Sequence, residues 1–569
     1  MRALVTVTHA APRHLAASAL AALALSAAPA LAGPAQFVIV NANAPGVGFN
    51  DPTPVAPVGG NTGTTLGEQR LIAFTHAAGI WSARLDSAVP IVISAQFTSL
   101  GTNVLGSAGP RYVTRDFPNA PLAGTWYHAA LANKLAGVDL QPTLHDINAN
   151  FSSDFNFYLG LDNNHGPLND LVAVLLHEFA HGLGFSQTAS LTTGALNGGF
   201  PDHYNTHLLD TTLGLRWPEM TDAQRLASAT RFGRVVWDGV GVTAAVPTVL
   251  SLGSPTVEVN SPASLAGGYQ FGTASFGPRI GSPSVTADIV EAVDAVEAGV
   301  VGATSTDGCS PLANAGAIAG RIALVERGQC GFVVKARNAT EAGAAAVIIY
   351  NNNTAANANA APPGMAGDGI NDAFVTVPTV SLRRADGVAI VAQLGGGVNA
   401  DIGVDLTLRA GADASNRARV YAPFPVVGGS SISHFDTVAS RNLLMEPAIN
   451  PDLTHNVKAP FDLTWELLHD VGWTFPDADG DTFPDDEDCN AASDVRPTII
   501  LNGRDTLVPN RGLGSGCTMT DRIVAAKAAS TSQPAFVLAV AVLTDAWRAA
   551  GLITTAQKAT IQVTAGKWR

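Results

Sequence analysis

The five residues His177–His181 read His-Glu-Phe-Ala-His and place two imidazoles and a carboxylate close together in the sequence. They follow an apolar run, 171–176, which begins directly after Asn169-Asp170, a pair of residue types that cap helices. Residues four apart lie on one face of a helix, so both imidazoles would point at the same place. The spacing predicts a zinc site formed by His177 and His181, with Glu178 beside the metal as general base.

A zinc site needs at least a third protein ligand, and the sequence offers several. In the compact metzincin pattern a third histidine comes three residues after the glycine, but that position is Gln187 here. Candidates that follow soon afterwards are His203, His207 and Glu219. A distant candidate is His434, which stands in a Ser-His-Phe-Asp sequence shortly before Met445-Glu446-Pro447.

This combination resembles the leishmanolysin-like metzincins, which share the helix motif, a third histidine after a long insertion, and a Met-Xaa-Pro turn. The resemblance covers roughly residues 36–230 and 425–475. It implies that His434 is the third zinc ligand and that Met445 lies beneath the metal. It also implies an α+β fold, with a mixed sheet beside the active-site helix, formed by residues 33–249 and 423–475.

The intervening segment has a pattern of its own. Residues 320–352 contain a β-type run, a glycine turn, a helical stretch and a second β-branched run, which predicts a strand-helix-strand unit. With its Arg-Gly-Gln-Cys-Gly-Phe turn and the later strand Val377–Leu382, this segment resembles a protease-associated (PA) domain. The resemblance implies an inserted α/β PA domain over residues 250–422, which modulates access of substrate to the cleft.

Other elements must position the zinc helix. Leu66–Leu85 has apolar residues at helical spacing, and Val89–Phe97 reads as a strand. Asp146–Leu159 alternates loosely, so we expect it to be the strand that borders the cleft, with an edge open to an extended peptide. Leu463–Trp473 is expected to be a closing helix.

Residues 1–32 predict a signal peptide, because Arg2 and Arg13 precede an Ala- and Leu-rich stretch that ends in Ala30-Leu31-Ala32. We therefore expect a secreted protein, extracellular or periplasmic. No other segment approaches the ~20 apolar residues of a membrane span. The net charge of −14 argues against nucleic acid and anionic membranes as partners.

The chain has four cysteines, which suit disulfides in an oxidising compartment. The expected pairs are Cys309 with Cys330, inside the PA-like unit, and Cys489 with Cys517, beyond the metzincin-like part. Other pairings stay open at this point. A cysteine nucleophile is not expected, because no base stands beside any of the four in the sequence.

An Asp-rich stretch follows the closing helix. Its carboxylates have the oxygen spacing of a calcium loop and resemble a thrombospondin type 3 repeat, which predicts Ca²⁺ as a second cofactor over residues 476–495. The candidate ligands are Asp477, Asp479, Asp481, Asp485 and Asp488. The alternative is a solvated acidic linker. Residues 496–569 are expected to be a small helical segment, with two helices joined near Gly551.

Taken together, these features predict an exported zinc metalloendopeptidase that acts on protein or peptide substrates, with a zinc-activated water and Glu178 as general base. Two alternatives stay open. One is a catalytically inactive secreted binding or adhesion protein, in which a fourth ligand such as His203 or His207 would close a structural zinc site. The other is a zinc hydrolase whose substrate is not a peptide.

Overall fold

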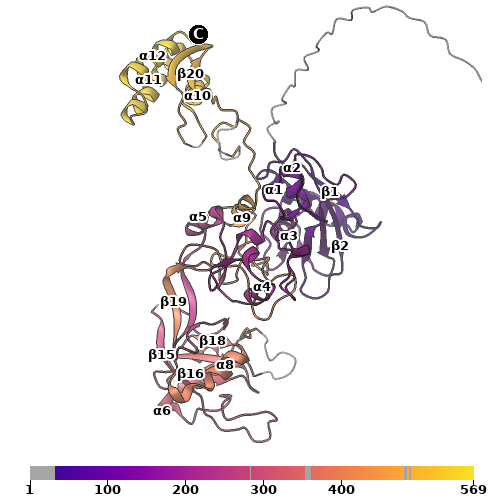
Figure 1. Ribbon diagram of the computed structural model, residues 1–569, viewed down its shortest axis with the longest axis vertical. Helices are drawn as coiled ribbons and strands as arrows, with labels where there is room; N and C mark the ends of the chain where they lie inside the picture. The colour runs from indigo at the N-terminus through magenta and orange to yellow at the C-terminus, as the bar shows by residue number, and fades with distance from the viewer. Residues whose placement is uncertain are drawn as a thin grey trace, which may run out of the picture.

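The computed structural model describes residues 33–281, 283–352, 361–479, 484–485, 488–514 and 516–568. The segment 1–32, predicted to be a signal peptide, lies outside these residues. Buried apolar side chains form separate cores in three bodies, which are visible as three groups of elements in Figure 1. The main body comprises residues 33–250 and 410–475, the inserted body residues 251–409, and the C-terminal body residues 496–568.

A four-stranded sheet forms one side of the main body. Its strands are β1 (Phe37–Asn41), β2 (Ile91–Thr98), β3 (Gly106–Pro110) and β6 (Ile147–Ser152). They lie in the order β1-β2-β6-β3, in which β1, β2 and β6 are parallel and β3 pairs antiparallel with β6. Buried and half-buried residues alternate along β2, as expected for a strand with one face on the core.

The prediction that residues 146–159 form the strand at the edge of the cleft is wrong. Strand β6 lies inside the sheet, because β2 and β3 pair with its two edges. The edge strand is β3, whose sequence Gly-Ser-Ala-Gly-Pro contains no β-branched or aromatic residue. Backbone pairing with β6, rather than the strand propensity of its own residues, therefore holds β3 in place.

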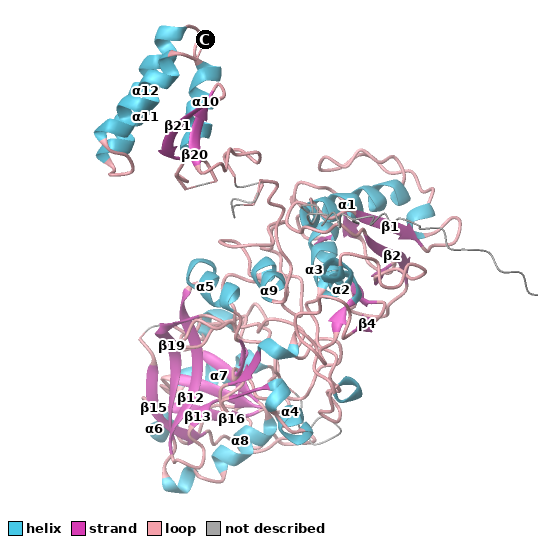
Figure 2. Cartoon of the chain, turned by 45° about the horizontal axis from the view of Figure 1, so that its top comes forward, coloured by secondary structure: helices cyan, strands magenta, loops and turns pink. Residues whose placement is uncertain are grey.

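Helices cover this sheet, as Figure 2 shows. They are α1 (Leu66–Ser82), α2 (Ala129–Ala136) and α3 (Leu171–Leu183). Thr65 and Glu68 start α1 with a capping box, in which each side chain bonds to the backbone N–H of the other residue. Trp81 of α1 is fully buried and donates its indole N–H to the Leu176 carbonyl of α3 at 3.2 Å. Every residue of α3 is buried, so α3 is the central helix of the main body.

Segments from both sides of the insertion complete the main body. The smaller elements are β4 (Val113–Thr114), β5 (Tyr127–His128), β7 (Phe157–Tyr158), β8 (Asn169–Asp170), β9 (Leu208–Asp210), β10 (Leu215–Arg216), α4 (Asp222–Ser228), β11 (Val235–Trp237), α5 (Val240–Val249) and α9 (Thr464–Asp470). Asp470 of α9 accepts hydrogen bonds from Trp237 Nε1 and Gly241 N, at 2.9 and 2.7 Å. Trp473 donates its indole N–H to the carbonyl of Leu183 at 2.9 Å. The closing segment is thereby joined to α3.

The inserted body is built on an eight-stranded sheet with the order β13-β12-β19-β15-β16-β17-β18-β14. Its elements are β12 (Leu252–Ser261), β13 (Gly267–Gly268), β14 (Gly272–Thr273), β15 (Val285–Glu291), α6 (Ala315–Ile318), β16 (Ile322–Glu326), α7 (Phe332–Glu341), β17 (Ala346–Tyr350), β18 (Thr379–Leu382), α8 (Arg384–Val391) and β19 (Asn399–Arg409). The predicted strand-helix-strand unit is β16-α7-β17, whose two strands are parallel. Because the first and last long strands, β12 and β19, pair antiparallel, the chain leaves and rejoins the main body at one place (Figure 1).

The C-terminal body differs from its prediction as a purely helical segment. A β-hairpin, β20 (Thr498–Leu501) and β21 (Arg504–Pro509), precedes three helices, α10 (Met519–Ala529), α11 (Gln533–Ala549) and α12 (Thr555–Gly566). The hairpin turns at Asn502-Gly503, where both residues have positive φ (48° and 72°), as a tight type I′ turn requires. The hairpin and helices share a core of their own, which explains why this body stands apart in Figure 1.

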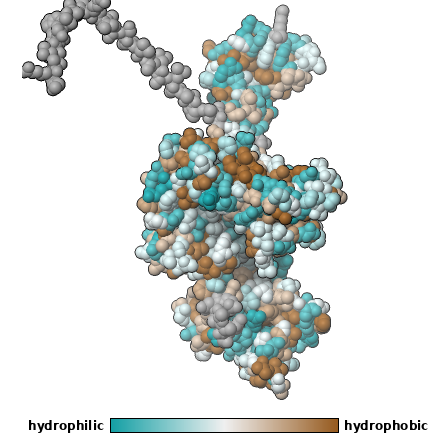
Figure 3. Space-filling model, turned by 90° about the vertical axis from the view of Figure 1, so that its right-hand side faces the viewer, coloured by the Kyte–Doolittle hydropathy of each residue, from teal (hydrophilic) through white to brown (hydrophobic). Residues whose placement is uncertain are grey.

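Both expected disulfides are confirmed: Cys309 pairs with Cys330, and Cys489 with Cys517. None of the helices in the described part of the chain is both long and apolar enough to cross a membrane. Figure 3 shows apolar residues interspersed with hydrophilic ones over the face that it presents. The α+β architecture that the sequence predicts is also confirmed.

Candidate metal centre

Helix α3 is fixed at both ends by residues next to it. At its start, Oδ1 of Asp170 accepts a hydrogen bond from Val172 N at 2.8 Å. At its end, Gly184 has φ 139°, where a side chain would be strained, and an added Cβ would lie 3.0 Å from Nε2 of His203. The chain turns at this glycine, so that the carbonyl of Phe185 meets the imidazole of His181.

Three histidines from two distant segments meet at one face of α3. The Nε2 atoms of His177 and His181 lie 3.1 Å apart, and Nε2 of His434 lies 3.2 Å from each of them. All three side chains are buried. The carbonyl of His434 accepts from Tyr421 N at 2.8 Å, so a short antiparallel contact positions this residue after the chain returns from the insertion.

A backbone carbonyl orients each imidazole through its other nitrogen. The Nδ1 contacts are His177 to Leu444 (2.7 Å), His181 to Phe185 (2.7 Å) and His434 to Ser430 (2.8 Å). A carbonyl oxygen can only accept, so each Nδ1 carries the hydrogen. In the neutral ring Nε2 then has a lone pair and no hydrogen. Three lone pairs therefore converge with no donor among them, which is the arrangement of metal ligands rather than of a hydrogen-bonded cluster.

Burial keeps these rings neutral. It lowers the pKa of His177 to about 4 and that of His181 to about 3, and it holds the pKa of His434 well below the usual range. Zinc bonds to histidine nitrogen are about 2.0–2.1 Å long, so tetrahedral ligands lie roughly 3.3 Å apart. The observed separations of 3.1 and 3.2 Å fit this value. Within the described residues, no fourth histidine, cysteine or carboxylate joins the group.

Glu178 lies beside the cluster on the same helix and is buried. Burial raises the pKa of its carboxyl to about 8, although a hydrogen bond from the backbone of Ala108 acts in the opposite direction. The carboxyl lies against strand β3, since a Cβ added at Gly106 would come 3.0 Å from Glu178 Oε1. The edge strand thus leaves room for the carboxyl because residue 106 has no side chain.

The turn that contains Met445 supports the cluster from the second segment. Met445 is fully buried, and its carbonyl accepts from Phe435 N, next to His434, at 2.8 Å. Glu446 is also buried, and its Oε1 accepts from Leu443 N at 2.8 Å. The turn is therefore closed on itself and bonded to the segment that carries the third histidine.

The other candidate ligands lie elsewhere. Nδ1 of His203 lies 3.1 Å from the Trp126 carbonyl, and the ring of His207 stacks on Trp237. Glu219 accepts from the backbone N–H of Arg216 at 2.7 Å. None of the three belongs to the group formed by the histidines of α3 and His434.

Several residues of the site were not foreseen in the sequence. They are Gly106, which makes room for Glu178, and the carbonyls of Phe185, Ser430 and Leu444, which orient the histidines. Carbonyls carry no sequence signal, because every residue has one. Strand β3 is also difficult to predict from its composition, because glycine, serine and proline usually indicate a loop.

The Asp-rich loop is described only in part. Asp481 lies outside the described residues. Asp479 accepts from Ser493 N, Asp485 from Ala478 N and Asp488 from Asn490 N, so backbone donors bond to these carboxylates. Asp477 is described as well, and the described carboxylates of the loop form no cluster of three ligand atoms.

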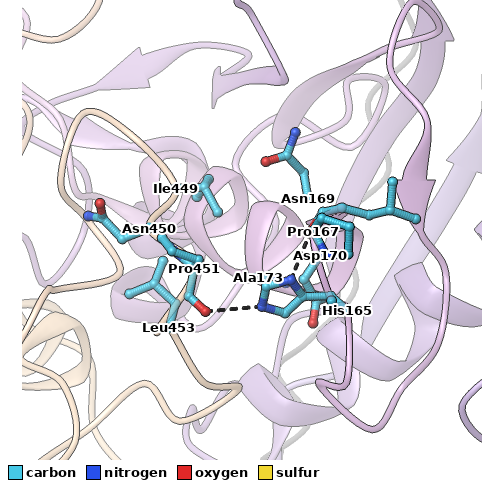
Figure 4. Close-up of a pocket in the computed structure, with 11 residues that line it drawn as sticks. His165, Pro167, Asn169, Asp170, Ala173, Ile449, Asn450, Pro451 and Leu453 are labelled. Atoms are coloured by element: carbon cyan, nitrogen blue, oxygen red, sulfur yellow. Dashed lines mark hydrogen bonds between the residues drawn. The ribbon is translucent and has the colours of Figure 1, made fainter. Parts of the chain in front are cut away.

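A small cavity lies at the start of α3, on the side of the Met445 turn (Figure 4). His165 spans it: Nδ1 lies 2.8 Å from the carbonyl of Leu168, and Nε2 lies 3.1 Å from the carbonyl of Pro451. None of the three clustered histidines lines this cavity. The contacts of His165 join the loop before α3 to the loop after Met445.

Comparison with known proteins identifies one part of the chain. Residues 285–390 match the model of the PA domain, which confirms that the insertion contains a PA domain. The chain is 44% identical over 85 residues to ER degradation-enhancing alpha-mannosidase-like protein 3 of Xenopus laevis, covering 15% of this chain and 9% of that protein. It is 56% identical over 50 residues to an aminopeptidase of Pseudomonas aeruginosa, covering 9% of each.

Among solved structures, a zinc aminopeptidase from Bacillus subtilis is similar over 29% of this chain and 35% of its own, at 23% identity and a TM-score of 0.19. The chain spans about a tenth of the length of the first two curated relatives and of the aminopeptidase. These comparisons establish that residues 285–390 form a PA domain.

Proposed function

We propose that this protein is an exported zinc metalloendopeptidase of the metzincin type. One observation carries the proposal: three buried, neutral imidazole nitrogens converge within 3.2 Å, with the buried carboxyl of Glu178 on the same helix. Three protein ligands with a further position left for water are typical of catalytic zinc, whereas structural zinc has four protein ligands. The histidine group among the described residues has three members.

Zinc, when bound by His177, His181 and His434, supplies a Lewis acid that polarises the substrate carbonyl and makes a water more acidic. The chain itself performs the proton transfers. Glu178 takes the proton from the attacking water and passes it to the leaving amine. Glu178 stands on the same helix as two of the proposed ligands, and Gly106, which has no side chain, leaves room for its carboxyl.

Strand β3 offers a place for an extended substrate. Its outer edge pairs with no other strand of the described chain, and it lies directly beside Glu178. A peptide added at this edge would form backbone hydrogen bonds and present its carbonyls to the site. In this proposal the PA domain modulates the access of protein substrates, and the similarity to an aminopeptidase supports a peptide substrate.

Two further parts of the proposal concern the surroundings of the protein. The predicted signal peptide and the two disulfides support secretion, since disulfides persist in oxidising compartments. Calcium binding by the Asp-rich loop stays a prediction from the spacing of its carboxylates.

The test compares the mature chain from residue 33 with Glu178→Gln and with Glu258→Gln, an exposed carboxylate on β12 that serves as the matched control. We expect the wild type and Glu258→Gln to hold about one zinc per chain and to cleave casein. Glu178→Gln should keep zinc and cleave about 10²–10⁴-fold more slowly, because only proton transfer is lost.

Full activity of Glu178→Gln would contradict the mechanism. A wild-type protein that binds zinc but cleaves neither casein nor short peptides would favour the alternative of a binding or adhesion protein. A zinc content that falls in Glu178→Gln would indicate that this carboxylate is a ligand instead of a base.

A further inference from the structure

A second cluster of ligand atoms lies in the PA domain. It consists of Asp294, Glu297 and Asp307, each of which offers one carboxylate oxygen within 4.8 Å of those of the other two. Asp294 and Asp307 have only 5% and 0% of their surface exposed, and Glu297 is half-buried. Carboxylates brought this close out of water repel one another, so their charge must be compensated locally.

The hydrogen bonds within the cluster leave three of its oxygens without a donor. Oδ2 of Asp294 accepts from the backbone N–H and the hydroxyl of Ser310, at 3.1 and 3.3 Å, whereas its Oδ1 is buried and unpartnered. Both carboxylate oxygens of Glu297 are likewise buried without a hydrogen-bond partner. A buried charged oxygen without a donor is costly, and three of them in one place indicate that the cluster binds a cation.

The nearby lysine compensates this charge only in part. Lys335 is fully buried, and its ammonium donates to the carbonyl of Asp307 and to Sγ of Cys309 instead of to the three carboxylates. The carboxylates act on it through space: each raises the pKa of Lys335, although burial, the larger effect, lowers it. Glu326 acts on Lys335 in the same way, but two threonine hydroxyls donate to its carboxylate. One positive charge against three negative charges leaves two negative charges, which a divalent ion would balance.

The backbone around the cluster is already held in place. All three carboxylates lie in the single connection between β15 and α6, residues 292–314. The N–H of Asp294 donates to the carbonyl of Ser305 at 2.9 Å, and Oδ1 of Asp307 accepts from Cys309 N at 3.2 Å. The disulfide from Cys309 to Cys330 joins this connection to the segment before α7. An ion at the cluster would therefore join two parts of one loop whose backbone is already held in place.

We propose that Asp294, Glu297 and Asp307 bind a calcium ion in the PA domain. The group offers oxygen only, which selects a hard cation over zinc or copper. Calcium accepts about six to eight oxygens in flexible geometry, so waters and backbone carbonyls can complete its shell, while magnesium demands a near-ideal octahedron. The proposal is independent of proteolysis and of the histidine cluster.

The test measures calcium binding to the full mature chain, loaded with zinc, by titration calorimetry with CaCl₂. Glu297→Gln and Asp294→Asn remove one charge each with little change of size, and exposed Glu258→Gln in the same domain is the control. We expect both cluster variants to bind one calcium fewer per chain than the wild type and the control. Saturating calcium should also raise the Tm of the wild type and the control more than that of the cluster variants.

An equal number of bound calcium ions in all four proteins would overturn the proposal, as would equal shifts of Tm. Calcium at the Asp-rich loop would be common to all four proteins, so it does not enter the difference. Two separate substitutions are used so that poor folding of one leaves the other as a test. Equal affinity for MgCl₂ and CaCl₂ at the cluster would overturn the assignment of calcium.

Discussion

Asp462 is connected to His177 through the backbone of Leu444. Oδ2 of Asp462 accepts from Leu444 N at 2.7 Å, and the carbonyl of Leu444 accepts from Nδ1 of His177 at 2.7 Å. The other oxygen of Asp462 accepts from Thr464 N at 2.7 Å, so both of its oxygens act as acceptors in a buried place. Asp462 does not touch the imidazole of His177, yet it thereby fixes the orientation of this proposed metal ligand.

We expect Asp462→Asn to weaken zinc binding by about 10- to 100-fold, the usual effect of losing an outer partner of a metal ligand. The new amide would present a donor where Asp462 accepts hydrogen bonds from N–H groups on two sides, so the Leu444 turn would shift. Competition with a chelator measures the affinity. Asp452→Asn, at an exposed position of the same segment, should bind zinc like the wild type. Equal affinities of the two variants would contradict a positioning role.

His434→Ala should lower the zinc content from about one ion per chain to well below one, because two histidines alone hold zinc poorly. His207→Ala removes a candidate ligand that lies outside the cluster, so its zinc content should not change. Metal analysis after dialysis measures both. If His434→Ala keeps both zinc and activity, the third ligand is another residue and the metzincin interpretation is wrong.

Gly106→Ala tests the contact between strand β3 and the proposed base. The new methyl group would lie 3.0 Å from Cγ and Oε1 of Glu178, so the carboxyl must move. We expect a loss of kcat of about tenfold with zinc retained, since the carboxyl must shift by a few tenths of an ångström and a shift near 1 Å costs about 10²-fold at active sites. Gly109→Ala, on the same strand and with nothing within 4 Å of its added Cβ, is the control and should keep full activity. Similar kcat values for the two variants would contradict the proposed contact.

The buried histidines should make the metal-free protein sensitive to acid. Burial lowers the pKa of His177 to about 4, below the value of about 6.5 in an unfolded chain. The unfolded chain therefore binds more protons between these values, and the stability contributed at pH 7 is lost as the pH falls from about 6.5 towards 4. Each such histidine contributes about 1.4 kcal/mol per pH unit in this window. Urea unfolding of the metal-free protein between pH 7 and 5 measures the slope.

Buried carboxyls act in the opposite direction. Burial raises the pKa of Glu446 to about 8 and that of Glu466 to about 7, so their stabilising effect is lost as the pH rises through these values. The comparison is therefore made against His177→Asn, which keeps both carboxyls. The wild type should lose more stability than this variant on acidification. Parallel pH profiles would show that His177 does not titrate as described.

Helix α3 could be predicted from the sequence because its signals are local. The apolar run, the capping Asp170 and the turn at Gly184 all lie within a few residues of the two histidines. The third histidine had no local signal, and only the resemblance to metzincins singled out His434. Its position depends on a chain that leaves the main body at β12 and returns at β19, a relationship that no periodicity encodes.

Strand β3 and the C-terminal hairpin were not predicted, for two different reasons. Strand β3 could not be predicted, because its residues have low strand propensity and its place depends on β6. The hairpin of the C-terminal body did carry a signal: Asn502-Gly503, a pair typical of a two-residue turn, directly follows the apolar residues 499–501. The Ala-rich helices after it dominated the composition of that segment.

The paired strands β12 and β19 also set an order of events while the chain is made. His181 emerges early, but His434 follows 253 residues later, after the complete PA domain has appeared. Domains tend to fold as units as the chain emerges, so the insertion can fold while the main body is still incomplete. An unfinished or truncated chain then holds only the two histidines of α3. The group of three histidines can therefore form only after His434 has been synthesised and has folded back onto α3.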